Sequence, residues 1–340
     1  MLTTSPAFKN LSFMRPRKII LSPEAYLEGI LRSDRVILSQ AITLVESMRT
    51  EHRAIAEQII AACLPYSGRS FRIGITGTPG VGKSTFIEAF GSCVTKAGHQ
   101  LAVLAIDPSS QITRGSILGD KTRMEQLGAN KQVYIRPSPA GTSLGGVAQR
   151  TRETVILCEA AGYDVVVIET VGVGQSEVVV HSMTDFFLLL LLPGAGDELQ
   201  GIKRGIVEMA DLIAVNKCDG EREQWAKQAQ QTYKNALHLL PPKESAWAAT
   251  AVACSALTGM GISDIWKMMQ GYHKQTVNNN YFVERRAIQS KYWLHESLIN
   301  TLRERFYASA QVQAALPNIE KLVLEGKLSP FAGATELLKL

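Results

Sequence analysis

Nine consecutive residues have the types and spacing of a phosphate-binding loop. Four residues separate a first glycine from a second, and a lysine and a serine follow directly. Glycines allow backbone N–H groups to close around phosphate oxygens, where a Cβ would obstruct them. The lysine is expected to reach the β- and γ-phosphates of a nucleoside triphosphate, and the serine hydroxyl to bind Mg²⁺. The loop consists of Gly77, Thr78, Pro79, Gly80, Val81, Gly82, Lys83, Ser84 and Thr85.

The two flanks of this loop agree with that interpretation. Residues 71–75 form a short apolar run that suits a buried strand, and residues 86–90 suit the first turns of a helix. Strand, glycine loop and helix form the context that the motif requires. The start of the helix adds a partial positive charge where the phosphates are expected. A glycine-rich turn with a chance lysine is the alternative, and it does not explain both flanks.

A second motif, in the order N-K-x-D, indicates which base is bound. Asn216 and Lys217 follow an apolar run that ends at residue 215, and Asp219 completes the pattern. The Asp219 carboxylate can accept hydrogen bonds from the N1–H and the 2-amino group of guanine, whereas adenine has no such donor pair. An unpaired buried polar group costs about 1–3 kcal/mol, and more when it is charged. The motif therefore predicts GTP rather than ATP. The segment expected to brace the base comprises Ser255, Ala256 and Leu257.

A third motif begins after the apolar run 164–168. Gly172 is expected to offer its N–H to the γ-phosphate, and Glu169 to hold Mg²⁺ through water. Small signalling GTPases carry an aspartate in place of this glutamate. They also carry a glutamine directly after the glycine, which orients the attacking water, and this chain has Val173 there. Gln175 is a nearby candidate for that role, and the alternative is a solvated loop amide.

Strands and helices must alternate to position these motifs. Apolar runs at 71–75, 101–106, 133–135, 164–168, 185–192, 211–215 and 252–254 predict strands with helical segments between them. This alternation predicts an α/β fold with a mostly parallel sheet covered on both faces, and ligands at the carboxyl ends of the strands.

The predicted organisation has four parts. A flexible tail covers residues 1–22, an N-terminal helical segment of two or three helices 23–70, a GTPase domain 71–272 and a C-terminal helical arm 273–340. The first helix is expected to begin with a Ser22 cap before proline. The last helices are expected to break at Pro317 and Pro330.

Composition excludes several classes of function. A net charge of +5 over 340 residues, without a dense Lys/Arg run, does not favour nucleic-acid binding. The longest apolar run, 186–192, is too short to span a membrane. The first 23 residues carry four basic residues and no acidic one, which suits a flexible tail or a mitochondrial targeting segment. Scattered cysteines favour reduced thiols in the cytoplasm; they are Cys63, Cys93, Cys158, Cys218 and Cys254.

The motifs together resemble one family. Residues 77–85, 107–110, 115–124, 169–177 and 216–219 are similar to the methylmalonyl-CoA mutase-associated GTPases, the MeaB/ArgK family of P-loop GTPases, and the resemblance covers roughly residues 24–340. It implies a P-loop NTPase fold that binds GTP and GDP with Mg²⁺ and hydrolyses GTP. It also implies a homodimer formed through the helical arms. The implied partner is methylmalonyl-CoA mutase: the GTPase gates the loading of adenosylcobalamin onto the mutase and protects it from inactivation.

The resemblance also implies roles for four residues in switch segments. Asp107 and Asp120 match acidic groups of the first switch that face the metal, alongside Ser84 and Glu169. The alternatives are a turn cap before Pro108 for Asp107 and a surface charge for Asp120. Residues 194–205 resemble a third switch that couples nucleotide state to the partner. Within it, Asp197 and Lys203 match positions that the family uses, and they join Lys83 and Glu169 as candidate catalytic residues.

The motifs contain no evident catalytic base, so slow intrinsic turnover is expected. Arg114, Lys121 and Lys203 are candidates for positive groups that stabilise the transition state. Three other functions compete with this prediction: a phosphotransferase or kinase acting on a transport protein, a metallochaperone GTPase, and a scaffold with degenerate nucleotide chemistry. The guanine-reading motif disfavours the first, the absence of clustered cysteine or histidine near the switches disfavours the second, and the intact motifs disfavour the third. The expected compartment is the cytoplasm, with the mitochondrial matrix as the alternative.

Overall fold

A computed structural model of the chain describes residues 20–47, 49–106, 124–138, 144–170, 176–194 and 204–340. Seven parallel strands form one sheet in the order β3-β2-β4-β1-β5-β6-β7. The predicted α/β fold with a parallel sheet is confirmed. The strands are β1 (Phe71–Gly77), β2 (Leu101–Ile106), β3 (Val133–Ser138), β4 (Val165–Thr170), β5 (Phe186–Leu191), β6 (Leu212–Val215) and β7 (Thr250–Ala253).

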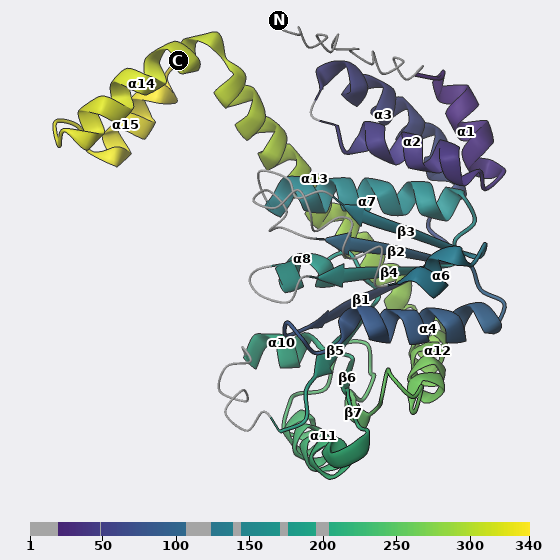
Figure 1. Ribbon diagram of the computed structural model, residues 1–340. Coiled ribbons are helices and arrows are strands. Elements are labelled where there is room, and N and C mark those ends of the chain that lie inside the picture. Colours follow the sequence, from purple (N-terminus) through teal and green to yellow (C-terminus); the bar gives the residue numbers. More distant parts are fainter. Residues whose placement is uncertain (1–19, 48, 107–123, 139–143, 171–175, 195–203) are drawn as a thin grey trace, which may run out of the picture.

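Helices cover both faces of the sheet (Figure 1). One face carries α4 (Lys83–Lys96), α6 (Glu125–Ala129) and α12 (Ile262–Asn278), whose apolar side chains pack on Ile73, Ile75 and their neighbours. The opposite face carries α7 (Leu144–Ala160), α8 (Ser176–His181), α10 (Arg204–Met209) and α11 (Glu223–His238). Because both faces are covered, every residue of β1 and β5 is buried. The strands are therefore continuous apolar runs rather than alternating ones.

Three helices form a further layer outside α7 (Figure 1): α1 (Pro23–Leu31), α2 (Arg35–Val45) and α3 (Thr50–Cys63). A short 3-10 turn, η1 (Leu64–Tyr66), leads from α3 to β1, and a second, η2 (Gly220–Arg222), precedes α11. The predicted start of α1 is confirmed, because the Ser22 side chain accepts a hydrogen bond of 3.3 Å from the Ala25 N–H and Pro23 occupies the first position.

The chain ends in α13 (Tyr281–Ala308), α14 (Ala310–Leu324) and α15 (Pro330–Leu337). The predicted break at Pro330 is confirmed, since α15 begins there with a Ser329 cap. The predicted break at Pro317 is wrong, because α14 continues through that residue. Gly333 of α15 lies so close to α14 that a Cβ on it would be 2.9 Å from the Ile319 side chain. This packing between the two helices offsets the backbone hydrogen bond that proline cannot make.

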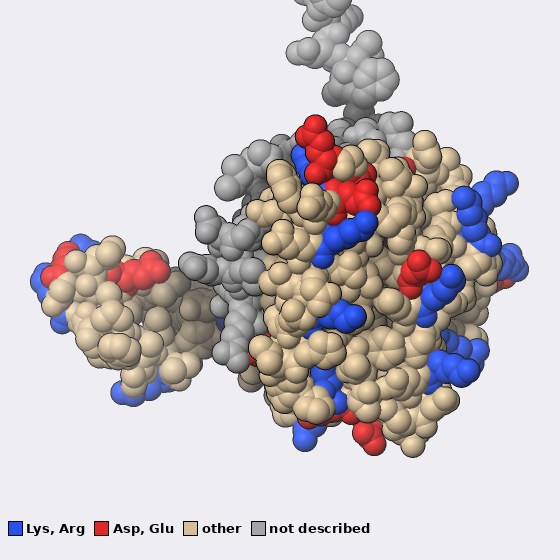
Figure 2. Space-filling view, turned by 90° about the horizontal axis from the view of Figure 1, so that it is seen from below, with Lys and Arg blue, Asp and Glu red and all other residues tan. Residues whose placement is uncertain are grey.

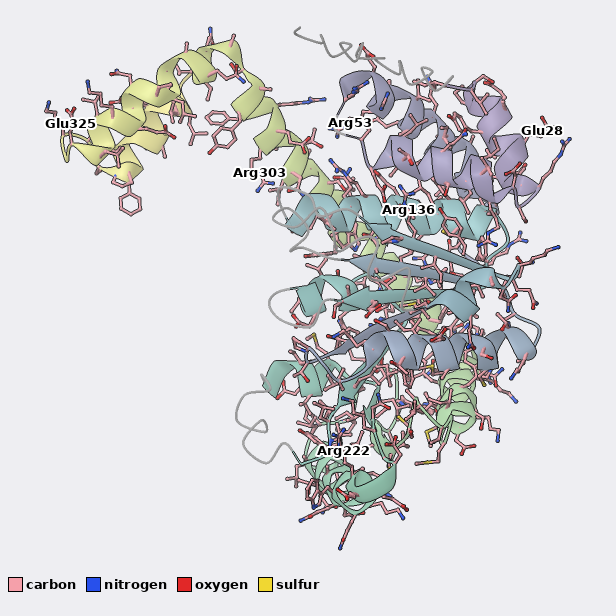
Figure 3. All side chains as sticks on the ribbon, in the orientation of Figure 1. Glu28, Arg53, Arg136, Arg222, Arg303 and Glu325 are labelled. Atoms are coloured by element: carbon pink, nitrogen blue, oxygen red, sulfur yellow. The ribbon has the colours of Figure 1, made fainter. Side chains whose placement is uncertain are left out.

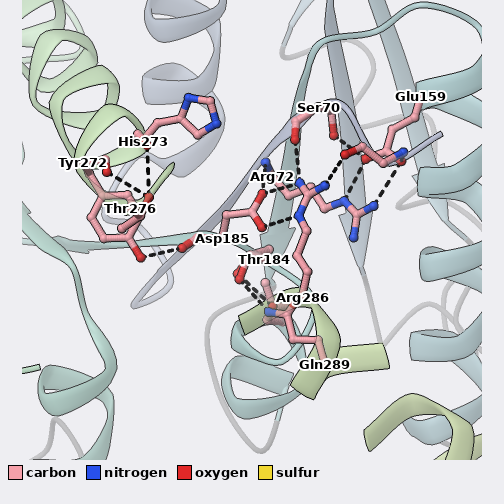
Figure 4. Close-up of polar contacts among 12 residues, drawn as sticks. Ser70, Arg72, Glu159, Thr184, Asp185, Tyr272, His273, Thr276, Arg286 and Gln289 are labelled. Atoms are coloured by element: carbon pink, nitrogen blue, oxygen red, sulfur yellow. Dashed lines mark hydrogen bonds and ion pairs between the residues drawn. The ribbon is translucent and has the colours of Figure 1, made fainter. Parts of the chain in front are cut away.

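Buried ion pairs fix the start of α13 to the amino end of the sheet (Figure 4). The Arg286 guanidinium donates to both carboxylate oxygens of Asp185, at 2.8 and 2.7 Å, and to the carbonyl oxygens of Gly68 and Ser70. Asp185 also accepts the Arg72 N–H at 2.8 Å. Burial alone would raise the pKa of Asp185, but the hydrogen bonds and charge of Arg286 hold it below its ordinary value. This helix is therefore a fixed part of the body where it begins.

Three further side chains of α13 bind the last residue of α8 and the short connector from it to β5, residues 182–185. Arg285 Nη2 lies 3.2 Å from His181 Nε2, Gln289 Nε2 donates to the Thr184 carbonyl at 2.9 Å, and Trp293 Nε1 donates to the Ser182 carbonyl at 3.1 Å. Burial and the neighbouring guanidinium lower the pKa of His181 to about 4, so this imidazole is neutral at physiological pH.

Beyond these contacts α13 leaves the sheet, and α14 and α15 stand apart from it (Figure 1). A cleft of about 610 Å³ lies between α3, α7 and α13, and the Arg53–Glu304 ion pair of 2.9 Å crosses it. Arg53 and Arg303 are labelled beside it in Figure 3. On the face seen in Figure 2, Lys and Arg side chains are spread among Asp and Glu rather than gathered into one patch.

Two further sequence predictions concern the cysteines and the membrane. All five cysteines are free thiols. No helix in the described part of the chain is long and apolar enough to cross a bilayer.

Candidate nucleotide site

The phosphate-binding loop joins β1 to α4 at the carboxyl end of the sheet. Gly77 ends β1 against β5, where a Cβ would lie 2.5 Å from the Leu190 carbonyl oxygen. Gly80 and Gly82 have φ angles of +80° and +91°, which other residues rarely adopt. The loop then turns directly into α4 at Lys83. The glycines are thus required by close approach and by backbone conformation, and the loop has the shape that its sequence predicts.

Lys83 is already held in the loop by backbone oxygens. Its ammonium donates to the Gly77 carbonyl at 2.8 Å and to the Thr78 carbonyl at 3.3 Å. Burial lowers the pKa of Lys83, and the nearby charges of Glu169 and Glu177 act in the opposite direction. An ammonium has three donors, so one remains for a phosphate oxygen.

Asn216 connects the phosphate loop to the base-reading segments. Its buried amide donates from Nδ2 to the Val81 carbonyl at 2.8 Å, and its Oδ1 accepts the Ala256 N–H at 3.0 Å. The neighbouring Lys217, whose φ is +62°, donates to the Gly80 carbonyl at 2.8 Å. The first two residues of the N-K-x-D motif therefore make their hydrogen bonds within the protein. They hold the phosphate side and the base side of the site at a fixed separation.

Replacing Asn216 with alanine should weaken GTP and GDP binding to the same extent. The substitution leaves the Val81 carbonyl and the Ala256 N–H without their partner, at about 1–3 kcal/mol, which corresponds to roughly a 5- to 150-fold loss of affinity. Titration with a fluorescent GDP and a non-hydrolysable GTP analogue measures both constants. Asn235→Ala, on the exposed face of α11, is the matched control. Unchanged affinity for both nucleotides would contradict the bridging role.

Asp219 is oriented by the segment after β7. The hydroxyl of Ser255 donates to Asp219 Oδ2 and accepts the Thr258 N–H at 3.2 Å. The Ala256 N–H is occupied by Asn216, and the Leu257 side chain is 80% exposed. The structure thus places Ser255 and Ala256 behind the residues that read the base. Direct contact of this segment with guanine stays a prediction.

Oxygen groups that suit Mg²⁺ lie on either side of Lys83. Ser84 occupies the first turn of α4, half-buried. Glu169 is half-buried near the end of β4, opposite Ile75 of β1, rather than after the strand as the sequence predicted. Thr78 Oγ1 is buried without a hydrogen-bond partner, as expected of a hydroxyl in a loop shaped for a ligand. Carboxylate and hydroxyl oxygens are the ligands that Mg²⁺ prefers, so the described residues fit the ion.

Eight predicted site residues lie outside the described residues: Asp107, Arg114, Asp120, Lys121, Gly172, Gln175, Asp197 and Lys203. Their roles stay predictions. Among the described residues, the structure brings together Lys83, Ser84 and Glu169 on the phosphate side, and Asn216 and Asp219 on the base side. One buried carboxylate near Lys83, that of Glu177, received no role from the sequence. Burial and missing partners are tertiary properties, so no local pattern could have indicated it.

Comparison with known proteins agrees with this geometry. Residues 38–311 match the family model described as methylmalonyl Co-A mutase-associated GTPase MeaB. The chain is 48% identical to a putative GTPase of Caulobacter vibrioides, over 91% of this chain and 94% of that protein. It is 44% identical to GTPase ArgK of Escherichia coli, over 92% and 94%. It is 43% identical to the mouse methylmalonic aciduria type A homolog, mitochondrial, over 92% and 77%.

A solved structure is also similar. The crystal structure titled LAO/AO transport system kinase superposes with a TM-score of 0.72 at 36% identity, over 94% of this chain and 98% of that one. The family match covers most of the chain, including the phosphate loop, the base-reading motif and α13. This chain therefore belongs to the MeaB family of P-loop GTPases.

Proposed function

We propose that this protein is a Mg²⁺-dependent GTPase that serves methylmalonyl-CoA mutase. In this proposal it gates the loading of adenosylcobalamin onto the mutase and protects the mutase from inactivation. The observation that supports the GTPase part is the joint geometry of Lys83, Asn216 and Asp219, whose hydrogen bonds link the phosphate-loop motif to the N-K-x-D motif. Membership of the MeaB family supports the mutase part.

Hydrolysis in this site would proceed by positioning and electrostatics. Backbone N–H groups of the loop would bind the phosphates, and Lys83, held by the Gly77 and Thr78 carbonyls, would donate its remaining N–H to an oxygen of the β- or γ-phosphate. Ser84 and Glu169 would hold Mg²⁺, with Asp107 and Asp120 as further proposed ligands. The ion supplies charge neutralisation at the β- and γ-phosphate oxygens. Because the Gly77 and Thr78 carbonyls fix the position of the Lys83 ammonium, little reorganisation opposes the stabilisation of charge on the bridging oxygen.

The base side of the site supplies the preference for GTP and GDP. Ser255 holds one carboxylate oxygen of Asp219 and fixes the orientation of the group. A fixed carboxylate accepts the N1–H and the 2-amino group of guanine together. Adenine would leave it unpaired in a half-buried position, which is the energetic origin of the discrimination.

The switch function is proposed from the family. The γ-phosphate would order Gly172 and the third switch with Asp197 and Lys203, and hydrolysis would release them. Several relatives, such as the mouse protein, are named methylmalonic aciduria type A homologs, which supports the proposed link to methylmalonyl-CoA mutase. We propose the cytoplasm as the compartment, with the mitochondrial matrix as the alternative that the name of the mouse relative supports.

A homodimer is proposed to form through the C-terminal arm. After Trp293, α13 carries several large apolar side chains that are more than half exposed, which is costly for a surface that faces only water. A second copy of the arm would cover them. They are Leu294, Leu298, Ile299, Leu302 and Tyr307.

We expect methylmalonyl-CoA mutase to raise the rate of GTP hydrolysis, because a partner can speed hydrolysis by adding a positive group to a GTPase site. Phosphate release is measured with and without an adenosylcobalamin-dependent mutase, with the mutase alone as the control. GTP labelled at the γ-phosphate shows in the same assay whether the phosphoryl group goes to water or to a protein hydroxyl. No stimulation and no complex would refute the mutase partnership and leave the GTPase proposal standing. Label on a protein would favour the phosphotransferase alternative.

A further inference from the structure

We infer that Glu177 is a catalytic residue of GTP hydrolysis, whose carboxylate accepts a hydrogen bond from the attacking water. The inference deepens the proposed GTPase function and rests on it. Two observations carry it: the position of Glu177 at the start of α8, and the burial of its Oε2 without a hydrogen-bond partner.

The position follows from how closely α8 packs on the strand that carries the phosphate loop. A Cβ on Gly74 of β1 would lie 3.0 Å from Val180 of α8 and 2.8 Å from Phe187. The absence of that Cβ lets α8 lie directly on β1 and β4. Glu177 is in the first turn of this helix, seven residues after Thr170 at the end of β4. Its backbone therefore lies near the carboxyl ends of the strands, the edge of the sheet at which the phosphate loop also lies.

The burial of Glu177 differs from that of the other buried carboxylates. In the described part of the chain four acidic residues are buried, and three of them bind both a cation and at least one backbone N–H: Glu159 with Arg72, Asp185 with Arg286, and Asp211 with Lys243. Glu177 is only 3% exposed, and its Oε2 has no hydrogen-bond partner. A buried polar atom without a partner costs about 1–3 kcal/mol, and more when charged. Buried polar atoms that lack a hydrogen-bond partner occur typically at binding sites, where the bound ligand supplies the missing partner.

The ends of β1 and β4 show which ligand. The phosphate loop follows β1, and Glu177 lies in the first turn of α8, the helix that follows β4 and packs on both strands. Glu169 and Glu177 therefore both belong to the carboxyl end of the sheet, where the β- and γ-phosphates are expected. Glu169 stands opposite Ile75 within the sheet, where it is proposed to serve the metal, so Glu177 is the second acceptor near the γ-phosphate.

The proposed step balances without any further reactant. The water oxygen forms a bond to the γ-phosphorus while the bond from that phosphorus to the β–γ bridging oxygen breaks, and its electron pair stays on GDP. The proton that leaves the water passes to Glu177 Oε2 and then to the released phosphate. General-base assistance of this kind contributes typically 10²- to 10⁴-fold to a rate.

The test compares the wild-type protein with Glu177→Gln and Glu177→Asp. The amide keeps the shape of the side chain but is a poor base, and the aspartate draws the carboxylate back by one methylene, about 1.5 Å. Single-turnover hydrolysis should fall at least about tenfold in both variants, while the affinity for a non-hydrolysable GTP analogue stays within about twofold. The melting temperature of nucleotide-free Glu177→Gln should be unchanged or higher, because an unpaired buried charge has been removed. Glu153→Gln, which removes a half-buried carboxylate of α7 that lines the cleft, is the matched control.

The outcomes separate the inference from the function on which it rests. Wild-type turnover in Glu177→Gln overturns the inference and leaves the GTPase proposal intact. A loss of nucleotide affinity equal to the loss of rate overturns it as well, since the residue would then act through Lys83. A lower melting temperature with a normal rate indicates a structural role only. If Glu177→Gln does not fold, Glu177→Asp decides the question by the same rate and affinity. Absence of hydrolysis in the wild-type protein refutes the proposed function itself.

Discussion

Replacing Lys83 with alanine should abolish measurable GTP hydrolysis. Two lysines bond to the backbone of the phosphate loop: Lys217 donates to the Gly80 carbonyl, and Lys83, at the start of α4, is held by the Gly77 and Thr78 carbonyls. Lys83 is the one that the motif places at the β- and γ-phosphates. Removing one preorganised donor to developing charge costs about 10²- to 10³-fold in rate, and a charged donor at the γ-phosphate stands at or above the upper end of that range. Phosphate release over hours, at saturating GTP and Mg²⁺, measures the effect.

The control for this substitution is Lys96→Ala, which removes an exposed lysine from the last turn of the same helix, α4. That variant should hydrolyse GTP at the wild-type rate. The melting temperature of Lys83→Ala should change little, because the lysine donates only to two carbonyls at the loop. Retained turnover in Lys83→Ala would show that the phosphates bind elsewhere.

Replacing Asp219 with asparagine should exchange the base preference of the site. The amide can no longer accept from both N1–H and the 2-amino group of guanine, so GTP affinity should fall on the order of 10²-fold. Xanthine carries a carbonyl in place of the 2-amino group, and an asparagine amide can donate to it. Affinity for xanthosine triphosphate should therefore rise. Competition of both nucleotides, and of ATP, against a fluorescent GDP measures the exchange.

Two further variants sharpen that experiment. Asp264→Asn changes an exposed carboxylate in the first turn of α12 and should leave all nucleotide affinities unchanged. Ser255→Ala removes the hydroxyl that holds Asp219 and should weaken GTP binding without favouring the xanthine nucleotide. Undiminished GTP affinity in Asp219→Asn would refute the base-reading role.

The sequence predicted the sheet because its central strands, such as β1 and β5, are buried on both faces. The run 185–192 predicted β5 without alternation, since helices cover both its sides. The helical ends were less predictable. Pro317 lies inside α14 because contact with α15 outweighs a local preference. Residue types along the chain therefore predict where a motif or strand lies, whereas packing against other helices determines where a helix such as α14 ends.

The same division applies to the site. The glycines, Lys83 and Asp219 were recognisable because their chemistry depends on type and spacing. The bridging role of Asn216 was not, because its partners Val81 and Ala256 lie 135 and 40 positions away in the chain. The role proposed for Glu177 could not be predicted for a different reason. Nothing in a sequence distinguishes a carboxylate whose two oxygens are both hydrogen-bonded, like that of Asp185, from one with an oxygen left without a partner.

The anchoring of α13 has a mechanical consequence. Arg285, Gln289 and Trp293 attach this helix to the end of α8 and to its connector into β5, at the amino end of the sheet. The other end of α8 begins at the carboxyl end of the sheet, beside the nucleotide site. From Trp293 to Ala308 the helix extends about 22 Å at 1.5 Å per residue. It is a lever with its pivot at the connector. A tilt of about 10° at the pivot displaces the far end by roughly 4 Å, the rise of between two and three residues. The anchored segment from Arg285 to Trp293 is about 12 Å long, so a shift of α8 that tilts it is enlarged roughly twofold before it reaches α14, α15 and the apolar side chains that α13 exposes.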